Sequence, residues 1–145
     1  MIGLIQRVAE ASVVVDGKPV ARIGKGILLL LGVEKADDTP QADRLLERIL
    51  NYRIFADDNG KMNLSLRDIQ GELLIVPQFT LPADTRKGNR PSFTPAAPPE
   101  TGHALFSYFC NLAQAQIGAL HCGVFGADMK VQLTNDGPVT FWLTT

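Results

Sequence analysis

The segment Asn135–Leu143 constrains the fold of this chain more than any other part of the sequence. Its turn tripeptide, Asp136-Gly137-Pro138, stands directly before an apolar run with strand composition. Glycine reaches backbone angles that a Cβ blocks, and proline fixes φ and removes an N–H. A cis Gly137-Pro138 bond would aim the glycine carbonyl where no side chain can. Only about 5–6% of X-Pro bonds in folded proteins are cis, so these residues alone favour a trans turn that ends a strand.

A second segment, Leu74–Leu81, has the composition of a buried strand that ends in polar residues. The apolar run Leu74-Ile75-Val76 is followed by Pro77, Gln78, Phe79 and Thr80. Side chains of the Gln and Thr type have little reason to lie in a core unless they find partners. The strand end is therefore a candidate site.

Together the two segments resemble the D-aminoacyl-tRNA deacylases, a family marked by a Ser-Gln-Phe-Thr segment and a C-terminal Asn-x-Gly-Pro-Val-Thr segment. Pro77 departs from this pattern, because it stands where the family usually has serine. Five further segments match in the same order, and the likeness covers essentially the whole chain. They are Met1–Val8, Tyr52–Phe55, Gly60–Asn63, Arg90–Phe93 and Ala127–Met129.

Apolar runs and turn residues predict one domain over residues 1–145, with no repeat or linker. Extended segments form a meander up to residue 33, and helices follow from about 40 to 52 and from 98 to the region 118–123. Asp57–Gly60 predicts a hairpin turn rather than a calcium loop, because the EF-hand spacing is absent. A proline-rich loop reaches about residue 97, after which segments 124–125, 129–133 and 139–143 close the sheet. The expected fold class is α/β (mixed α+β), a single compact domain in which mixed twisted sheets form a barrel-like core with two main helices packed on one side.

Composition excludes several classes of function. The formal net charge is −1, so any contact with RNA must be local, and binding to DNA is not expected. Cys110 and Cys122 lack the spacing of a zinc site or redox pair and predict buried free thiols. No signal peptide or membrane-spanning run is recognisable, which predicts a soluble, cytoplasmic protein. No metal or cofactor is expected.

Conventional hydrolytic machinery is missing from the sequence. His103 and His121 stand in no recognisable relation to a serine elbow, and no P-loop or dinucleotide motif follows a strand. An aminoacyl-tRNA ester is already activated by its neighbouring 2′-hydroxyl and ammonium. Such a substrate needs positioning and charge stabilisation more than a protein nucleophile.

The resemblance implies roles for seven residues and a hydrolase that frees D-amino acids, and achiral glycine, from tRNA. Gln78, Phe79 and Thr80 would arrange the ester, ribose and water. Gly137 and Pro138, joined by a cis peptide, would enter the active site of the partner in a homodimer, hold the α-ammonium and reject L-amino acids. Phe125 and Ala127 fall where the family receives the terminal adenosine, although Phe125 is equally well explained as a buried strand residue.

Two features leave alternatives open. Pro77 removes a hydroxyl and an N–H from the strand end. The chain is then either an active deacylase that relies on backbone positioning, or a weakened binder of RNA 3′ ends. A general esterase for free D-amino-acid esters is a third possibility. The cationic cluster 86–90 is either a solvated run or a rim that attracts phosphates beside the site.

Overall fold

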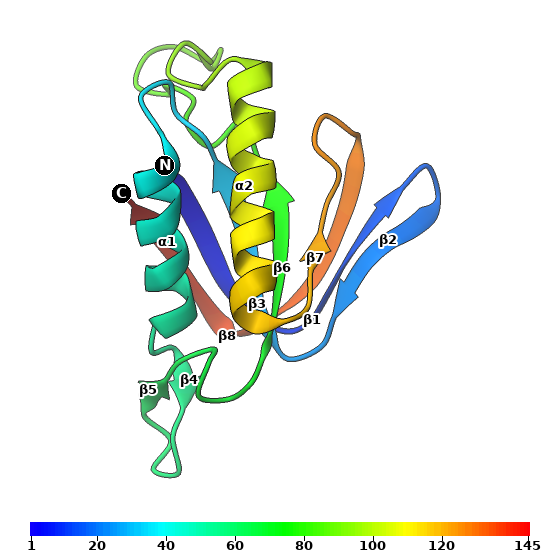
Figure 1. Cartoon of the computed structure of the whole chain (residues 1–145), viewed down its shortest axis with the longest axis vertical. Coiled ribbons are helices and arrows are strands. Elements are labelled where there is room, and N and C mark those ends of the chain that lie inside the picture. The colour runs from blue at the N-terminus through cyan, green and yellow to red at the C-terminus, as the bar shows by residue number, and fades with distance from the viewer.

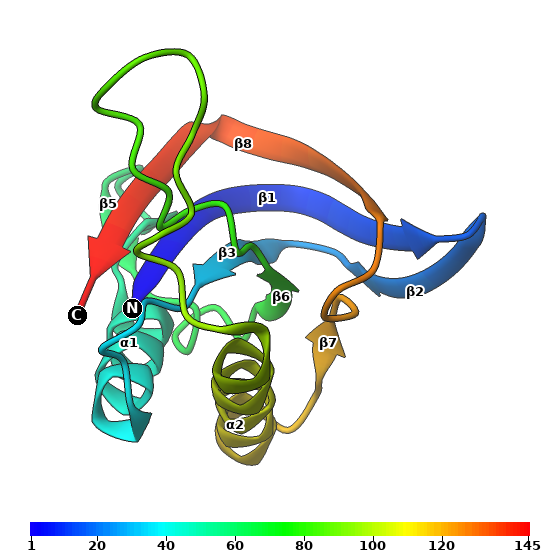
Figure 2. The same ribbon diagram turned by 90° about the horizontal axis from the view of Figure 1, so that it is seen from above.

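Two helices cover one face of a strongly curved sheet (Figures 1 and 2). The computed structural model describes all residues, 1–145. In chain order its elements are β1 (Ile2–Val15), β2 (Lys18–Ile23), β3 (Gly26–Gly32), α1 (Thr39–Asn51), β4 (Phe55–Ala56), β5 (Met62–Leu64), β6 (Glu72–Pro77), α2 (Pro99–Ile117), β7 (His121–Cys122) and β8 (Met129–Thr144). None of the helices combines the length and the apolar character needed to cross a membrane.

Strand β1 organises the main sheet, because three strands pair with it in antiparallel fashion. β8 runs along one edge, while β3 pairs with the first half of the other edge and β2 with the second half. β6 is parallel to β3, and β7 is parallel to β6. The predicted meander is therefore wrong in one respect: β2 pairs with β1 and does not lie between β1 and β3.

Side chains of the central strands alternate between the two faces of the sheet and so build two hydrophobic cores. Ile27, Leu29 and Leu31 of β3 face the helices, while Leu28 belongs to a second cluster on the opposite face, with Val8 and Val13 of β1. Met129 and Val131 of β8 pack against this second cluster, so the sheet curls back on itself. The expected mixed α+β fold, with a barrel-like core and both helices on one side, is confirmed.

Both predicted helices are confirmed, and their ends have local causes. Asp38 caps α1 by accepting from the Thr39 N–H at 2.8 Å, while its own N–H donates to the Gln41 side chain. α2 ends at Gly118, whose φ of +80° gives the left-handed cap that glycine adopts without a steric penalty.

One of the shorter predictions is confirmed and several others need correction. Residues 57–60 do form the hairpin turn between β4 and β5. The predicted strand at 124–125 is wrong, since β7 is His121–Cys122 and the following residues turn. The predicted strands 129–133 and 139–143 are one strand, β8, whose register with β1 shifts opposite Val8. Cys110 and Cys122 are free, but only Cys110 is buried, and burial raises the pKa of its thiol.

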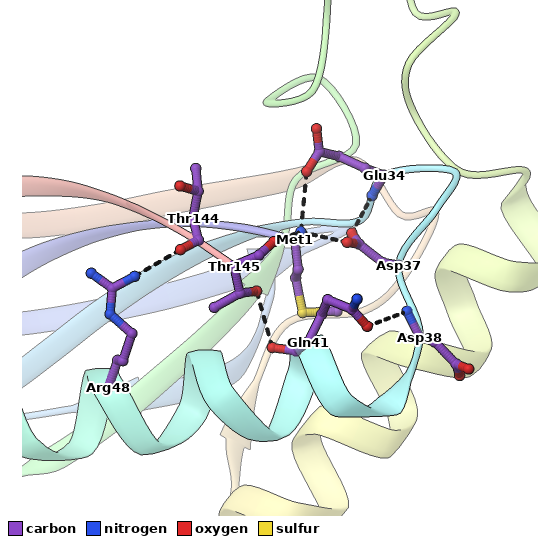
Figure 3. A network of polar contacts seen from close by, with 8 residues as sticks. All are labelled: Met1, Glu34, Asp37, Asp38, Gln41, Arg48, Thr144 and Thr145. Atoms are coloured by element: carbon purple, nitrogen blue, oxygen red, sulfur yellow. Dashed lines mark hydrogen bonds and ion pairs between the residues drawn. The ribbon is translucent and has the colours of Figure 1, made fainter.

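The two ends of the chain meet beside α1 (Figure 3). The Met1 ammonium, which is completely buried, donates to Asp37 Oδ1 at 2.5 Å, to Glu34 Oε2 at 3.1 Å and to the Thr145 carbonyl at 3.1 Å. The Thr145 N–H returns a bond to the Met1 carbonyl. A buried positive charge is thus balanced by two carboxylates, as a stable fold requires.

Candidate functional site

An apolar cavity of about 440 Å³ opens where β3 and β6 end against the start of α2. Ten of its fifteen lining residues are hydrophobic, which suits a ligand with a flat or apolar portion. The walls come from four regions: the ends of β3 and β6, the start of α2, the turn before β8, and the first residues of β8. The lining includes Leu31, Val33, Val76, Pro77, Gln78, Phe79, Gly102, Phe106, Phe125, Ala127, Met129 and Val131.

The chain leaves β6 in a tight turn that exposes main-chain donors. The Gln78 N–H still donates to the Leu31 carbonyl at 2.8 Å, whereas the N–H groups of Phe79 and Thr80 have no acceptor in the chain. The Gln78 side chain donates to Thr80 Oγ1 at 2.5 Å, which orients both polar groups. Two adjacent free N–H groups beside an apolar cavity are suited to binding a carbonyl oxygen or an oxyanion.

Pro77 occupies a position where its missing N–H costs the sheet no hydrogen bond. Successive N–H groups of a strand point to opposite sides, and that of Gln78 points toward β3. The nitrogen of Pro77 therefore faces the other side, where β7 has already ended at Cys122. This edge position explains how a strand buried along most of its length ends in proline.

A turn between β7 and β8 brings Phe125 and Ala127 to the same cavity. The Gly123 N–H donates to the Ile75 carbonyl at 2.8 Å, which anchors the turn to β6, and the Ala127 N–H closes it on Val124. The Phe125 ring packs against the His103 and Phe106 rings of α2, with centroids 5.1 and 6.1 Å apart. Phe125 is thus a partly exposed wall residue rather than a buried strand residue.

Gly137 and Pro138 lie elsewhere, and they do not line this cavity. Both are exposed in the middle of β8, and the bond between them is cis, so the trans turn favoured by the residues alone is wrong. The Asn135 side chain accepts from the Val139 N–H at 3.0 Å and so ties together the two sides of the dipeptide. The predicted site residues therefore form two separate groups within one chain.

Arg7 holds the second group in place, and the sequence prediction missed it. Its Nε donates to the Asp136 carbonyl at 2.9 Å, and its Nη1 donates to the Ile54 carbonyl at 2.7 Å. The available signal was that Arg7 is the one charged residue among the first nine. Such a residue in a strand otherwise committed to the core needs partners, and here they are two main-chain carbonyls and, at 3.7 Å, the Asp136 carboxylate.

The histidines are not at the centre of the cavity. His103 packs on Phe125 from the exposed side of α2, and His121 Nε2 is 3.5 Å from Glu72 Oε1. Neither lines the cavity. Nowhere in the chain do three histidine, cysteine or acidic side chains gather closely enough to hold a metal ion. The groups offered to a ligand are thus apolar walls, the Gln78 and Thr80 side chains, and main-chain N–H groups.

Comparison with known proteins gives one consistent result. The family described as D-Tyr-tRNA(Tyr) deacylase matches residues 4–144. D-aminoacyl-tRNA deacylases of Alkalilimnicola ehrlichii and Nitrosococcus oceani are 63% and 59% identical over 143 residues, which cover 99% of this chain and 95% and 92% of theirs.

Solved structures agree on the fold. The c-Myc DNA unwinding element binding protein superimposes with a TM-score of 0.95 at 38% identity, covering 100% of this chain and 99% of its own. A probable eukaryotic D-amino acid tRNA deacylase superimposes with a TM-score of 0.85 at 19% identity, covering 99% and 98%, and this likeness concerns the fold alone.

Proposed function

This chain belongs to the D-Tyr-tRNA(Tyr) deacylase family, and from that premise we propose that it hydrolyses the ester bond of D-aminoacyl-tRNA, releasing the free D-amino acid and the tRNA in the cytoplasm. One observation supports this most directly. The free N–H groups of Phe79 and Thr80 stand at the mouth of an apolar cavity large enough for an adenosine with an amino acid attached.

In the proposed reaction the terminal adenosine lies against Phe125 and Ala127, and the ester carbonyl points at the end of β6. Water attacks the carbonyl carbon, the bond to the ribose oxygen breaks, and the proton of the water passes to that oxygen. Negative charge that develops on the carbonyl oxygen is stabilised by the N–H groups of Phe79 and Thr80. Gln78 and Thr80 orient the water and the ribose, whose 2′-hydroxyl assists the departure of its neighbour.

We assign the choice between D- and L-amino acids to Gly137 and Pro138 of a second copy of the chain. Both residues are exposed and lie outside the cavity of their own chain, so they reach such a cavity only across an interface. β8 pairs on one edge only, and Trp142 on the same strand is 52% exposed, as expected of a surface that a homodimer covers.

In this arrangement, main-chain carbonyls of Gly137 and Pro138 hold the α-ammonium of the substrate. The side chain of an L-amino acid then collides with the dipeptide, while that of a D-amino acid points away. Because no side chain of the protein reads the amino acid, many D-amino acids are accepted. Glycine has no side chain to collide, so glycyl-tRNA is also a substrate.

The first test compares D-tyrosyl-tRNA, L-tyrosyl-tRNA and glycyl-tRNA. We expect rapid release of D-tyrosine and glycine and no release of L-tyrosine above the rate in buffer. Release of neither enantiomer would favour the alternative, a weakened binder of RNA 3′ ends, which Pro77 suggests. Equal turnover of D-tyrosine methyl ester and D-tyrosyl-tRNA would instead indicate a general esterase.

A mixing experiment tests whether each site uses two chains. Ala127→Trp fills the cavity, and Gly137→Ala disrupts the Gly137-Pro138 dipeptide, so each variant alone should be inactive. A heterodimer of the two contains one site built from undamaged parts. Random re-association should therefore restore about one quarter of the wild-type activity. No recovery, although native electrophoresis shows that heterodimers form, would refute the shared site.

A further inference from the structure

Two exposed aromatic rings connect the cavity with the long loop between β6 and α2. Phe79 lines the cavity, yet 62% of the residue is exposed, and Phe93 is 44% exposed. Their ring centroids are 5.4 Å apart at an interplanar angle of 50°. Adjacent exposed aromatic rings are typical of a surface that binds a partner, and the chain itself leaves these two open.

The part of the loop that precedes Phe93 in the sequence concentrates positive charge. Its arms are joined by two main-chain hydrogen bonds between Asp84 and Ser92, at 2.8 and 3.0 Å. Between these residues lie Arg86, Lys87 and Arg90, all exposed, and the loop projects from the body of the protein (Figures 1 and 2). With Asp84 and Ser92 they line a second cavity of about 400 Å³ that has no hydrophobic wall.

The three cations of the loop are not equivalent. Arg86 Nε and Nη2 bind both carboxylate oxygens of Asp84, at 2.9 and 2.7 Å, and this contact holds the pKa of Asp84 well below its usual range. Arg86 therefore serves mainly to shape the loop. Lys87 and Arg90 form no ion pair or side-chain hydrogen bond within the chain, so their charges are available to a ligand. They stand out on a protein whose net charge is −1.

We propose that this surface, made of Phe79, Phe93, Lys87 and Arg90, binds the unpaired nucleotides that precede the terminal adenosine of tRNA. The inference rests on the proposed function, because the terminal adenosine must occupy the cavity. From there the strand leaves past Phe79, where bases stack on the two rings, and its phosphates meet Lys87 and Arg90. Aromatic platforms beside cationic side chains are the usual means of binding single-stranded nucleic acid.

The decisive experiment compares two substrates that differ only in the RNA beyond the adenosine. These are D-tyrosyl-tRNA and the 3′-D-tyrosyl ester of free adenosine, each tested with the Lys87→Ala/Arg90→Ala double variant. We expect kcat/KM for D-tyrosyl-tRNA to fall about tenfold and to depend less steeply on salt, by about one to two units of the logarithmic slope. For the adenosine ester kcat/KM should stay within twofold of wild type.

Lys18→Ala/Lys61→Ala provides the matched control. It removes the same charge from two exposed lysines, neither of which forms an ion pair, at the tips of the β1–β2 and β4–β5 hairpins, far from the loop in Figure 1. This control should retain activity toward both substrates. For the aromatic pair, Phe93→Leu should lower kcat/KM for D-tyrosyl-tRNA about tenfold. Phe93→Tyr, which keeps a stacking surface, should leave this kcat/KM unchanged.

The possible failures are distinguishable. If the wild-type protein hydrolyses neither ester, the proposed function is wrong. If it hydrolyses both, but the loop variants lose activity equally on both, the loop supports the cavity and does not bind RNA. Unchanged activity on D-tyrosyl-tRNA also refutes the proposal. If sedimentation shows that Phe93→Leu separates two copies of the chain, the aromatic pair belongs to an interface between proteins.

Discussion

The guanidinium of Arg7 donates to the carbonyl oxygen of Asp136 across 129 positions of sequence. The same side chain reaches the Ile54 carbonyl, so one charged group joins β1, the segment before β4 and the middle of β8. Only 15% of the Arg7 side chain is exposed. A half-buried guanidinium that loses these acceptors would be costly, and the backbone before Gly137 is correspondingly well held.

Replacing Arg7 by alanine should loosen the Gly137-Pro138 segment and slow the hydrolysis of D-aminoacyl-tRNA. Hydrogen bonds from a charged donor contribute about 1.5–3 kcal/mol, so we expect the free energy of unfolding to fall by about that amount. Urea denaturation and deacylation of D-tyrosyl-tRNA measure the two effects.

Two variants complete the Arg7 test. Arg7→Lys should rescue little, because an ammonium cannot span two carbonyls as the planar fork does. Arg22→Ala, which removes an arginine that is 74% exposed and paired with Glu10, should change stability by less than about 0.5 kcal/mol. A result in which Arg7→Ala behaves like Arg22→Ala would contradict the assigned role.

Gly137→Ala should damage both stability and activity. The φ of Gly137 is +142°, and a Cβ there would lie 2.6 Å from Val139 Cγ2 and 3.1 Å from Arg7 Nη2. We expect a loss of about 1–3 kcal/mol from the backbone conformation and the clash together. Gly17→Ala is the matched control, since Gly17 also has a positive φ but its Cβ would meet nothing within 4 Å. Similar destabilisation of both variants would show that the contact with Val139 and Arg7 is unimportant.

Asp37→Asn should destabilise the protein strongly while leaving the site intact. The Asp37 side chain is 6% exposed and binds both the Met1 ammonium and the Glu34 N–H. Asparagine keeps an acceptor but removes a charge, and breaking a buried ion pair costs about 3–5 kcal/mol. Glu34→Gln should cost less, because Glu34 is 39% exposed. Thermal unfolding compares the two variants. Equal decreases in Tm would show that burial does not determine how much each carboxylate contributes to stability.

Pro77→Ser should be nearly neutral. The nitrogen of Pro77 faces an edge without a partner strand, so the substitution adds a donor that water can satisfy. We expect stability within about 1 kcal/mol of wild type. We also expect kcat/KM for D-tyrosyl-tRNA within a few-fold, since the free N–H groups of Phe79 and Thr80 are unaffected. An increase of a hundredfold or more would indicate that the serine hydroxyl takes part in the reaction and that this chain is impaired.

Local features of this chain were predictable because neighbouring residues decide them. Asp38 and Pro40 start α1, and the spacing of Leu45, Leu46, Ile49 and Leu50 predicts which face is buried. The apolar run of β3 and the polar end of β6 were likewise evident. The position of β7 was mistaken because a two-residue strand is selected by its pairing with β6 rather than by its own composition.

Sequence patterns were enough to predict the class of fold, the two helices, the exposed polar end of a core strand, and through resemblance the residues around it. Tertiary structure decided which of those residues share a cavity and which do not. Phe125 lines the same cavity as Phe79 because Gly123 is anchored to β6, whereas Gly137, next to the Asp136 that Arg7 binds, does not line it. Such arrangements depend on contacts between residues that are 48 and 129 positions apart in the sequence, and no local preference of the backbone encodes them.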